Sequence, residues 1–262
     1  MSKSDFSSFT IAQINDFLVN ERGNKGFTKV LEELEHDGRS GVQKLIKREK
    51  SFILKSEQRK QHSIEMYQEE KYYRDKGYEM ICGVDEAGRG PLAGPVVAAA
   101  VVLGSLDLND YYDDSKKLST SHREEMYDKI ISKAISVSIS LRTSDYIDSN
   151  NILSATLDSM EESIKELSVK PNIILVDGNV KIPNVTQKQV LITQGDAKVR
   201  VIAAASIIAK VYRDKIMEEY DKKYPLYKFS KHKGYGTQEH IELIKKYGPC
   251  DIHRKSFLEN II

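Results

Sequence analysis

The chain has 262 residues, and its 40 basic and 39 acidic side chains leave a formal net charge of +1. That length allows one full core plus a smaller appendage, and the balanced charge excludes a global basic field, so any nucleic-acid affinity must come from local patches. No apolar stretch approaches the roughly 20 residues that span a bilayer. Cys82 and Cys250 lie far apart, without CxxC spacing, and no apolar leader is present. We therefore expect a soluble, cytoplasmic protein with reduced thiols.

Residues 1–70 are expected to form a small helical extension. Thr10 and Gln13 make a capping-box pattern ahead of apolar residues at helical spacing. A second short helix is expected to end at an Asp-Gly pair, and Ser40 with Gln43 repeats the capping-box pattern at the start of a third.

The third helix of this extension carries an excess of basic side chains. They are Lys44, Lys47, Arg48, Lys50, Lys55, Arg59 and Lys60. Such a stripe either binds phosphate groups or is a solvated helix face. The sequence leaves both interpretations open.

The stretch 81–103 predicts a strand, a glycine-rich turn and a second strand. A short apolar run ends at two adjacent carboxylates, Asp85 and Glu86, and a longer apolar run begins at Val96. Charged groups at the end of a buried strand cost desolvation energy unless a counter-ion, a metal or a ligand compensates. The alternative is a tight hairpin whose two acids are simply solvated.

Helices and strands alternate through the remainder of the chain. The expected elements are a helix from Ser121 to about Lys133, a half-exposed strand over 134–141, a helix capped by Asn150 and reaching Leu167, strands over 173–176 and 190–192, a long apolar helix from Val199, and a last helix capped by Thr237. This order predicts an α/β sheet packed by helices.

Acidic residues follow two of these strands and precede the apolar helix. They are Asp85, Glu86, Asp177 and Asp196. Ligands of α/β sheets bind beyond the carboxyl ends of strands, and two carboxylates 4 Å apart repel by roughly 4 kcal/mol at an effective dielectric of 20. Such a site takes up protons or binds a divalent metal, and oxygen ligands without His or Cys suit Mg²⁺ or Mn²⁺. The alternative is that the Asp-Gly and Gly-Asp pairs are ordinary turns.

Seven motifs, in this order, resemble those of bacterial type 2 ribonuclease H. They are Asp85-Glu86-Ala-Gly88-Arg89-Gly90-Pro-Leu-Ala-Gly-Pro, Asp-Ser115-Lys116-Lys117-Leu118, Val-Asp177-Gly178-Asn, Gly-Asp196, Ala-Ala-Ser206-Ile-Ile-Ala-Lys210-Val, Lys-Gly234-Tyr235-Gly-Thr and His253-Arg254-Lys-Ser256-Phe257. The similarity covers about residues 72–258. The last motif reads His-Arg-Lys-Ser-Phe where His-Arg-Arg-Ser-Phe is expected, so Lys255 replaces a planar bidentate donor.

The resemblance implies a ribonuclease H-like mixed sheet flanked by helices, with a catalytic domain at 71–262. It implies Mg²⁺- or Mn²⁺-dependent cleavage of RNA in RNA–DNA hybrids or at ribonucleotides embedded in duplex DNA. The family's metal-binding and catalytic acids fall on Asp85, Glu86, Asp177 and Asp196. Its ribonucleotide-reading motif falls on Gly88-Arg89-Gly90, and its junction-sensing tyrosine falls on Tyr235.

The residue chemistry is compatible with these roles. Glycines let backbone N–H groups approach a ribose closely, and the 2′-OH distinguishes RNA from DNA. Arg89 either clamps a phosphate or neutralises the two acids before it. Lysines and aromatic residues interleave around Tyr235, as on a phosphate-tracking surface. Ser115, Lys116 and Lys117 are interpreted as phosphate contacts or as an ordinary approach to a helix.

We predict a monomeric type 2 ribonuclease H. The alternatives are a type 3 ribonuclease H and a non-catalytic nucleic-acid-binding module. Four histidines are not at metal-ligand spacing, and none is assigned as a ligand; they are His122, His232, His240 and His253.

Overall fold

The computed structural model describes residues 6–107, 112, 118–259 and 261. The chain divides into two compact units, residues 1–62 and 63–262. In the described part of the chain, no helix is long and apolar enough to cross a membrane.

The smaller unit is helical, as predicted. It contains η1 (Phe6–Ser8), α1 (Ile11–Glu21), α2 (Phe27–Leu34) and most of α3 (Ser40–Met66). These helices enclose a core that includes Ile14, Leu18, Leu31 and Val42.

The first predicted cap of this unit is confirmed, and the second is wrong. Thr10 caps α1 through a capping box with Gln13. Ser40 is itself the first residue of α3, and the Gln43 side chain donates to the backbone carbonyls of Glu35 and Asp37 at 3.1 and 2.6 Å. The amide therefore satisfies carbonyls at the end of α2 and in the linker instead of closing a box on Ser40.

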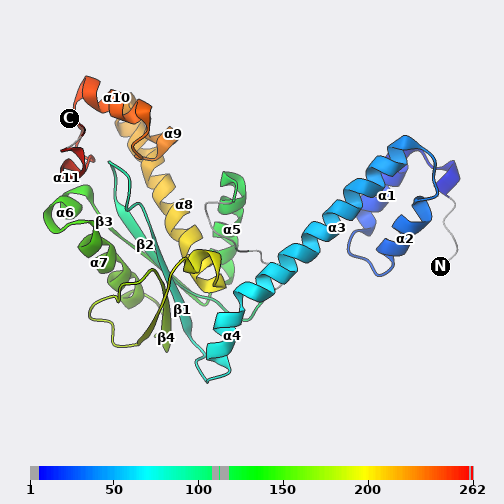
Figure 1. Cartoon of the computed structure of the whole chain (residues 1–262), viewed down its shortest axis with the longest axis horizontal. Helices are drawn as coiled ribbons and strands as arrows, with labels where there is room; N and C mark the ends of the chain where they lie inside the picture. Colours follow the sequence, from blue (N-terminus) through cyan, green and yellow to red (C-terminus); the bar gives the residue numbers. More distant parts are fainter. Residues whose placement is uncertain (1–5, 108–111, 113–117, 260, 262) are drawn as a thin grey trace. The chain divides into compact units, whose positions relative to one another are not determined.

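A five-stranded mixed sheet forms the centre of the larger unit (Figure 1). Its strands are β1 (Ile81–Ala87), β2 (Val96–Val102), β3 (Ser136–Arg142), β4 (Ile173–Asp177) and β5 (Lys188–Ile192). The strand order is β3-β2-β1-β4-β5; β1 and β4 are parallel, as are β4 and β5, whereas β2 is antiparallel to both its neighbours. The predicted mixed sheet flanked by helices is confirmed.

Helices cover both faces of this sheet (Figure 1). On one face, α8 (Arg200–Lys223) packs against β1 and β2, with α5 (Thr120–Lys133) beside it. On the other face, α7 (Ile152–Lys165) packs against β2 and β3. The remaining elements are α4 (Gln68–Arg74), α6 (Ser144–Asn150), η2 (Gly195–Ala197), η3 (Pro225–Tyr227), α9 (Phe229–His232), α10 (Gln238–Tyr247) and α11 (Lys255–Leu258).

Close packing of α8 on β1 depends on Gly83. A Cβ at this position would lie 2.3 Å from the carbonyl oxygen of Val201 and 2.7 Å from the backbone nitrogen of Ile202. Both contacts are with backbone, so a side chain here would force the helix away from the sheet. The glycine thus sets how near α8 comes to the strand that carries the first two acids.

In the larger unit, two further helix starts differ from the predicted ones. Ser119, not Ser121, caps α5 by accepting from the backbone N–H of His122. Asn150 ends α6, a helix that the sequence pattern did not reveal, and Asn151 caps α7 by accepting from the Ser154 N–H. Asn151 has a φ of 66° and a ψ of 162°, outside the left-handed helical region, and this sharp turn separates the two helices.

Candidate active site

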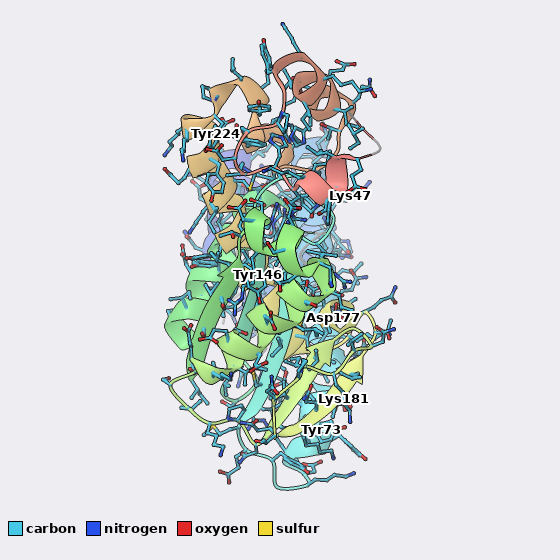
Figure 2. The ribbon with its side chains drawn as sticks, turned by 90° about the vertical axis from the view of Figure 1, so that its left-hand side faces the viewer. Lys47, Tyr73, Tyr146, Asp177, Lys181 and Tyr224 are labelled. Atoms are coloured by element: carbon cyan, nitrogen blue, oxygen red, sulfur yellow. The ribbon has the colours of Figure 1, made fainter. Side chains whose placement is uncertain are left out.

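Strand register brings two of the predicted acids together. Val84 of β1 pairs with Val176 of β4 in parallel, so Asp85 and Asp177 follow at equivalent positions of neighbouring strands. Alternation places both on the face covered by α8, while Glu86 is directed to the opposite face. Asp177, labelled in Figure 2, is the last residue of β4.

Burial makes the charge of this site costly. Asp85 is only 4% exposed, and burial raises its pKa well above the ordinary aspartate value, with the charges of Glu86 and Asp177 adding to the rise. Hydrogen bonds from the Ser206 hydroxyl and from the backbone N–H of Glu86 oppose that rise. Burial also raises the pKa of Glu86, where the Arg89 guanidinium opposes the shift and the charge of Asp177 adds to it.

The turn that precedes α8 ties Asp196 to this region. The backbone N–H of Gly195 donates to Oδ1 of Asp177 at 2.6 Å, and Asp196, which is buried, is the next residue. A Cβ on Gly195 would lie 2.7 Å from the Ile202 side chain and 3.3 Å from the same Asp177 oxygen. Glycine therefore lets the turn reach the end of β4.

The donor set of these acids fits a hard divalent cation. Among the residues that the structure describes, no three His, Cys, Asp or Glu side chains stand close enough to make a finished ion site. Asp85, Glu86 and Asp177 nevertheless interact through their charges, and burial disfavours the charges of Asp85 and Glu86. Carboxylate oxygens are the ligands that Mg²⁺ and Mn²⁺ prefer, and a cation would relieve both the repulsion and the desolvation cost.

The glycine-rich turn after β1 has one glycine that the fold requires and one that it does not. Gly88 has a φ of 97°, and a Cβ there would lie 2.2 Å from Nε of Arg213. A Cβ on Gly90 would meet no described atom within 4 Å. Between them, Arg89 is exposed and donates from Nη1 to Glu86 at 3.3 Å, so in this structure it partly neutralises an acid.

Tyr235 has a fixed backbone and an accessible ring. Its N–H donates to the carbonyl of His232, and its own carbonyl accepts from Nδ1 of His240, each at 2.9 Å. The side chain is 43% exposed, so the phenol ring can contact another molecule. Ser115 and Lys116, the other predicted substrate contacts, lie outside the described residues.

A chain of buried histidines lies directly behind Tyr235. Nδ1 of His253 accepts from the backbone N–H of Cys250 at 2.9 Å, so its proton is on Nε2, which donates to Nε2 of His240 at 3.1 Å. His240 then carries its proton on Nδ1 and donates to the Tyr235 carbonyl. The ring of His232 stacks on that of His240 with centroids 4.3 Å apart. No sequence pattern connects these histidines, which here support the tyrosine loop.

Lowering the pH should destabilise the fold through this chain. Burial lowers the pKa values of His240 and His253 to about 4, from an ordinary value of 6.5. The unfolded chain therefore binds protons first as the pH falls, so stability from these groups is fully present above about pH 6.5 and is lost progressively toward pH 4. Thermal unfolding measured from pH 8 to pH 4 should show the decline.

Two variants test whether these histidines cause the decline. His240→Gln should lower the unfolding temperature at pH 8 but flatten its pH dependence. His36→Gln removes an exposed histidine from the linker after α2 and should reproduce the wild-type profile. A wild-type profile in His240→Gln would assign the acid sensitivity to other groups.

Comparisons with known proteins identify the family. The family model for ribonuclease HII matches residues 82–260, and that for the ribonuclease HII N-terminal domain matches residues 10–74. Ribonuclease HII of Caldicellulosiruptor bescii is 54% identical over 188 residues, covering 72% of this chain and 91% of the relative. Ribonuclease HII of Lactobacillus helveticus is 50% identical over 228 residues, covering 87% of this chain and 90% of the relative.

A solved structure agrees with these matches. The ribonuclease H2 from Pyrococcus horikoshii OT3 is similar to this chain with a TM-score of 0.59 and 28% identity, over 67% of this chain and 92% of that chain. The non-catalytic and type 3 alternatives are therefore set aside. The chain belongs to the ribonuclease HII family, and it is a metal-dependent endoribonuclease of ribonuclease H type 2.

Proposed function

We propose that the protein hydrolyses the RNA strand of RNA–DNA hybrids and also incises duplex DNA on the 5′ side of a single embedded ribonucleotide, leaving a 3′-OH. The observation that carries this proposal is the cluster of Asp85, Glu86 and Asp177 beside the glycine-rich turn, in which burial and mutual repulsion raise the pKa values of Asp85 and Glu86. We further propose that it acts as a monomer.

Asp85, Glu86, Asp177 and Asp196 would hold two Mg²⁺ or Mn²⁺ ions. Once bound, such ions would supply the activation of a water and the stabilisation of the leaving oxygen of a phosphodiester. The protein's own contribution is orientation. The Ser206 hydroxyl and the Glu86 N–H fix the carboxylate of Asp85, and the Gly195 N–H fixes that of Asp177.

The turn at 88–90 would read the ribose. Gly90 leaves open space in which backbone N–H groups can approach a 2′-OH without interference from a Cβ. Arg89 is half exposed, so its guanidinium can exchange Glu86 for a phosphate when substrate binds. Ser115 and Lys116 would add phosphate contacts.

Tyr235 would read the next sugar. Its exposed ring can pack against a deoxyribose, which lacks the 2′-OH, while its backbone stays fixed by hydrogen bonds. The turn and the ring would together select a ribonucleotide followed by a deoxyribonucleotide. Water, and not the 2′-OH, would be the nucleophile.

Asp85→Asn and Asp177→Asn should each lower kcat by on the order of 10²–10³-fold or more. Each substitution removes a carboxylate charge that would hold a metal ion at the scissile phosphate. In Asp177→Asn the amide oxygen of the new side chain can still accept from the Gly195 N–H, so the fold should persist. Without metal, thermal stability should hold or rise, because the neutral amide relieves repulsion. Single-turnover cleavage of a duplex with one ribonucleotide measures the loss.

The matched control is Glu161→Gln. Glu161 is a buried carboxylate on α7, at the other face of the sheet, and it pairs with Lys165. Its replacement should leave kcat unchanged. A near wild-type rate in either aspartate variant would remove that residue from the active site.

Tyr235→Ala should reduce the preference for a single embedded ribonucleotide over a continuous RNA strand by about tenfold, since packing of an aromatic ring on a nucleotide contributes roughly 1–3 kcal/mol. Tyr235→Phe should lose less, because the ring is retained. The comparison uses kcat/KM on the two duplexes, with analysis of the product ends.

Tyr247→Ala is the control for this substitution. Tyr247 ends α10 and is also 43% exposed, so it matches Tyr235 in accessibility. Its loss should leave the preference unchanged. An unaltered preference in Tyr235→Ala would contradict junction reading, and a cyclic phosphate product would contradict attack by water.

The basic face of α3 supports a second proposal, that the N-terminal unit binds the phosphate backbone of the substrate. Val42, Ile46 and Ile53 face the core of this unit. At 100° per residue, Lys44 and Lys55 lie on the opposite side of the helix, together with Arg48 and Arg59. All four are exposed.

Neutralising this face should weaken binding in a salt-dependent way. Each lost phosphate contact lowers the slope of log K against log salt by about 0.9, so Lys44→Gln/Lys55→Gln should reduce it by roughly 1–2 with kcat unchanged. Lys50→Gln/Lys60→Gln removes the same charge from other sides of α3 and should change the slope less. If the slope of log K against log salt is the same in both double variants and in wild type, the basic face of α3 is a solvated helix face that does not bind the substrate.

A further inference from the structure

Two arginine side chains are buried under the substrate-reading loops. Arg213 of α8 is 1% exposed, and Arg254, just before α11, is 0% exposed. Their guanidinium groups donate three and four hydrogen bonds respectively, and within the described chain all of these go to backbone carbonyl oxygens. Neither forms a salt bridge there, which is unusual for fully buried cations.

Arg254 holds both ends of the glycine-rich loop, residues 88–95. Its guanidinium donates to the carbonyls of Gly88 at 2.5 Å and Arg89 at 2.9 Å, and twice to that of Gly94, at 2.9 and 3.0 Å. A peptide unit is planar and trans, so its C=O and N–H point in opposite directions. Since the carbonyls of residues 88 and 89 point inward to Arg254, the N–H groups of Arg89 and Gly90 point away from it.

Arg213 joins this loop to the one that carries Tyr235. It donates to the carbonyls of Ala93 at 3.0 Å, Pro95 at 2.9 Å and Lys233 at 2.9 Å. Its Cζ lies 5.9 Å from the centre of the Tyr235 ring. One side chain thus contacts the glycine-rich loop, the residue two before the tyrosine, and the neighbourhood of the ring itself.

Backbone hydrogen bonds complete the connection. Leu92 N–H donates to the carbonyl of Gly234, Gly94 N–H to that of Ile252, and Arg254 N–H to that of Leu92, each at 2.8 Å. A Cβ on Gly234 would lie 2.5 Å from the Ala93 carbonyl, so the two loops are in direct contact. These contacts join the two loops to each other.

This arrangement has an electrostatic cost. Burial lowers the pKa of Arg254 to about 9, and the nearby Arg213 adds to the shift; burial also lowers the pKa of Arg213. Buried charges without ionic partners do little for stability as such. What the two side chains supply is a fixed geometry, because each planar fork holds several carbonyls at once.

We propose that Arg213 and Arg254 are positioning residues that set substrate specificity. They hold the N–H groups of Arg89 and Gly90, which would contact the ribose, at a fixed separation from the Tyr235 ring, which would contact the next sugar. Only a ribonucleotide followed by a deoxyribonucleotide makes both of these contacts. This role rests on the proposed function of the two loops. Neither arginine touches the substrate.

Arg213→Lys and Arg254→Lys test the role, because lysine keeps the charge and loses the planar fork. Each should lower the ratio of kcat/KM for a single-ribonucleotide duplex to that for a continuous RNA strand by about tenfold, since small misplacements of binding groups cost that much or more. The two arginines lie on different elements, so if one variant does not fold, the other decides.

Arg200→Lys is the matched control. Arg200, the first residue of α8, is 3% exposed and also donates to backbone carbonyls, those of Gly104 and Ser105. Unlike the other two arginines, it forms a salt bridge, with Glu70 of α4. Its replacement should lower the unfolding temperature comparably and leave the substrate ratio unchanged. A proportional loss on both substrates in all three variants would overturn the positioning role.

Hydrogen exchange provides a readout independent of activity. The amides of Leu92 and Gly94 are bonded across the loops, and they should exchange faster in Arg213→Lys and Arg254→Lys but not in Arg200→Lys. Unchanged exchange would overturn the proposal. If the wild-type enzyme cuts continuous RNA strands but not single ribonucleotides, the proposed function is overturned, and the specificity role of the arginines is overturned with it. The exchange measurement would still show, independently, whether the arginines fix the loops.

Discussion

The carboxylates at the ends of β1 and β4, one of them buried and one half-buried, are the constraint on which the site depends. Gly83 lets α8 approach β1 closely enough for the Ser206 hydroxyl to reach Asp85, and the Gly195 N–H reaches Asp177 from the turn before the same helix. These hydrogen bonds orient the acids but do not neutralise them, and burying an uncompensated ion costs several kcal/mol. The same packing that makes the acids costly makes the site receptive to divalent cations.

The buried positive charges are kept apart from these acids. Arg213 and Arg254 donate to backbone carbonyls of residues 88–95 and of Lys233, and in the described part of the chain the exposed Arg89 is the arginine that donates to Glu86. A buried arginine paired with Asp85 would lower its pKa and reduce its need for a metal. The two charge systems are therefore separate in the structure: the acids lie at strand ends, and the arginines hold the loops to which we assign substrate reading.

Local patterns predicted most of the fold. Apolar runs revealed β1, β2 and β4, alternation revealed β3, and the acids could be found because they follow strands. The patterns failed where the start of a helix depends on contacts with other segments. At Ser40, the expected capping-box partner Gln43 instead donates to backbone carbonyls that precede the helix. At Asn150, the residue expected to cap a helix is the last residue of a short helix that no pattern predicted. The supporting residues could not be found in this way, since Arg254 is 166 residues from Gly88 in the chain, and a contact of that range leaves no periodic signal.

The departure of the last motif from the expected His-Arg-Arg-Ser-Phe now has a physical account. Arg254 is fully buried, and its fork holds three carbonyls, which the single ammonium group of lysine could not do. Lys255 is exposed, and its backbone N–H donates to Asp148, as does that of Ser256. Position 255 thus contributes through its main chain, which any residue other than proline supplies. Lysine therefore replaces arginine at position 255, where no planar guanidinium group is needed, and not at position 254, where the guanidinium group holds the loop.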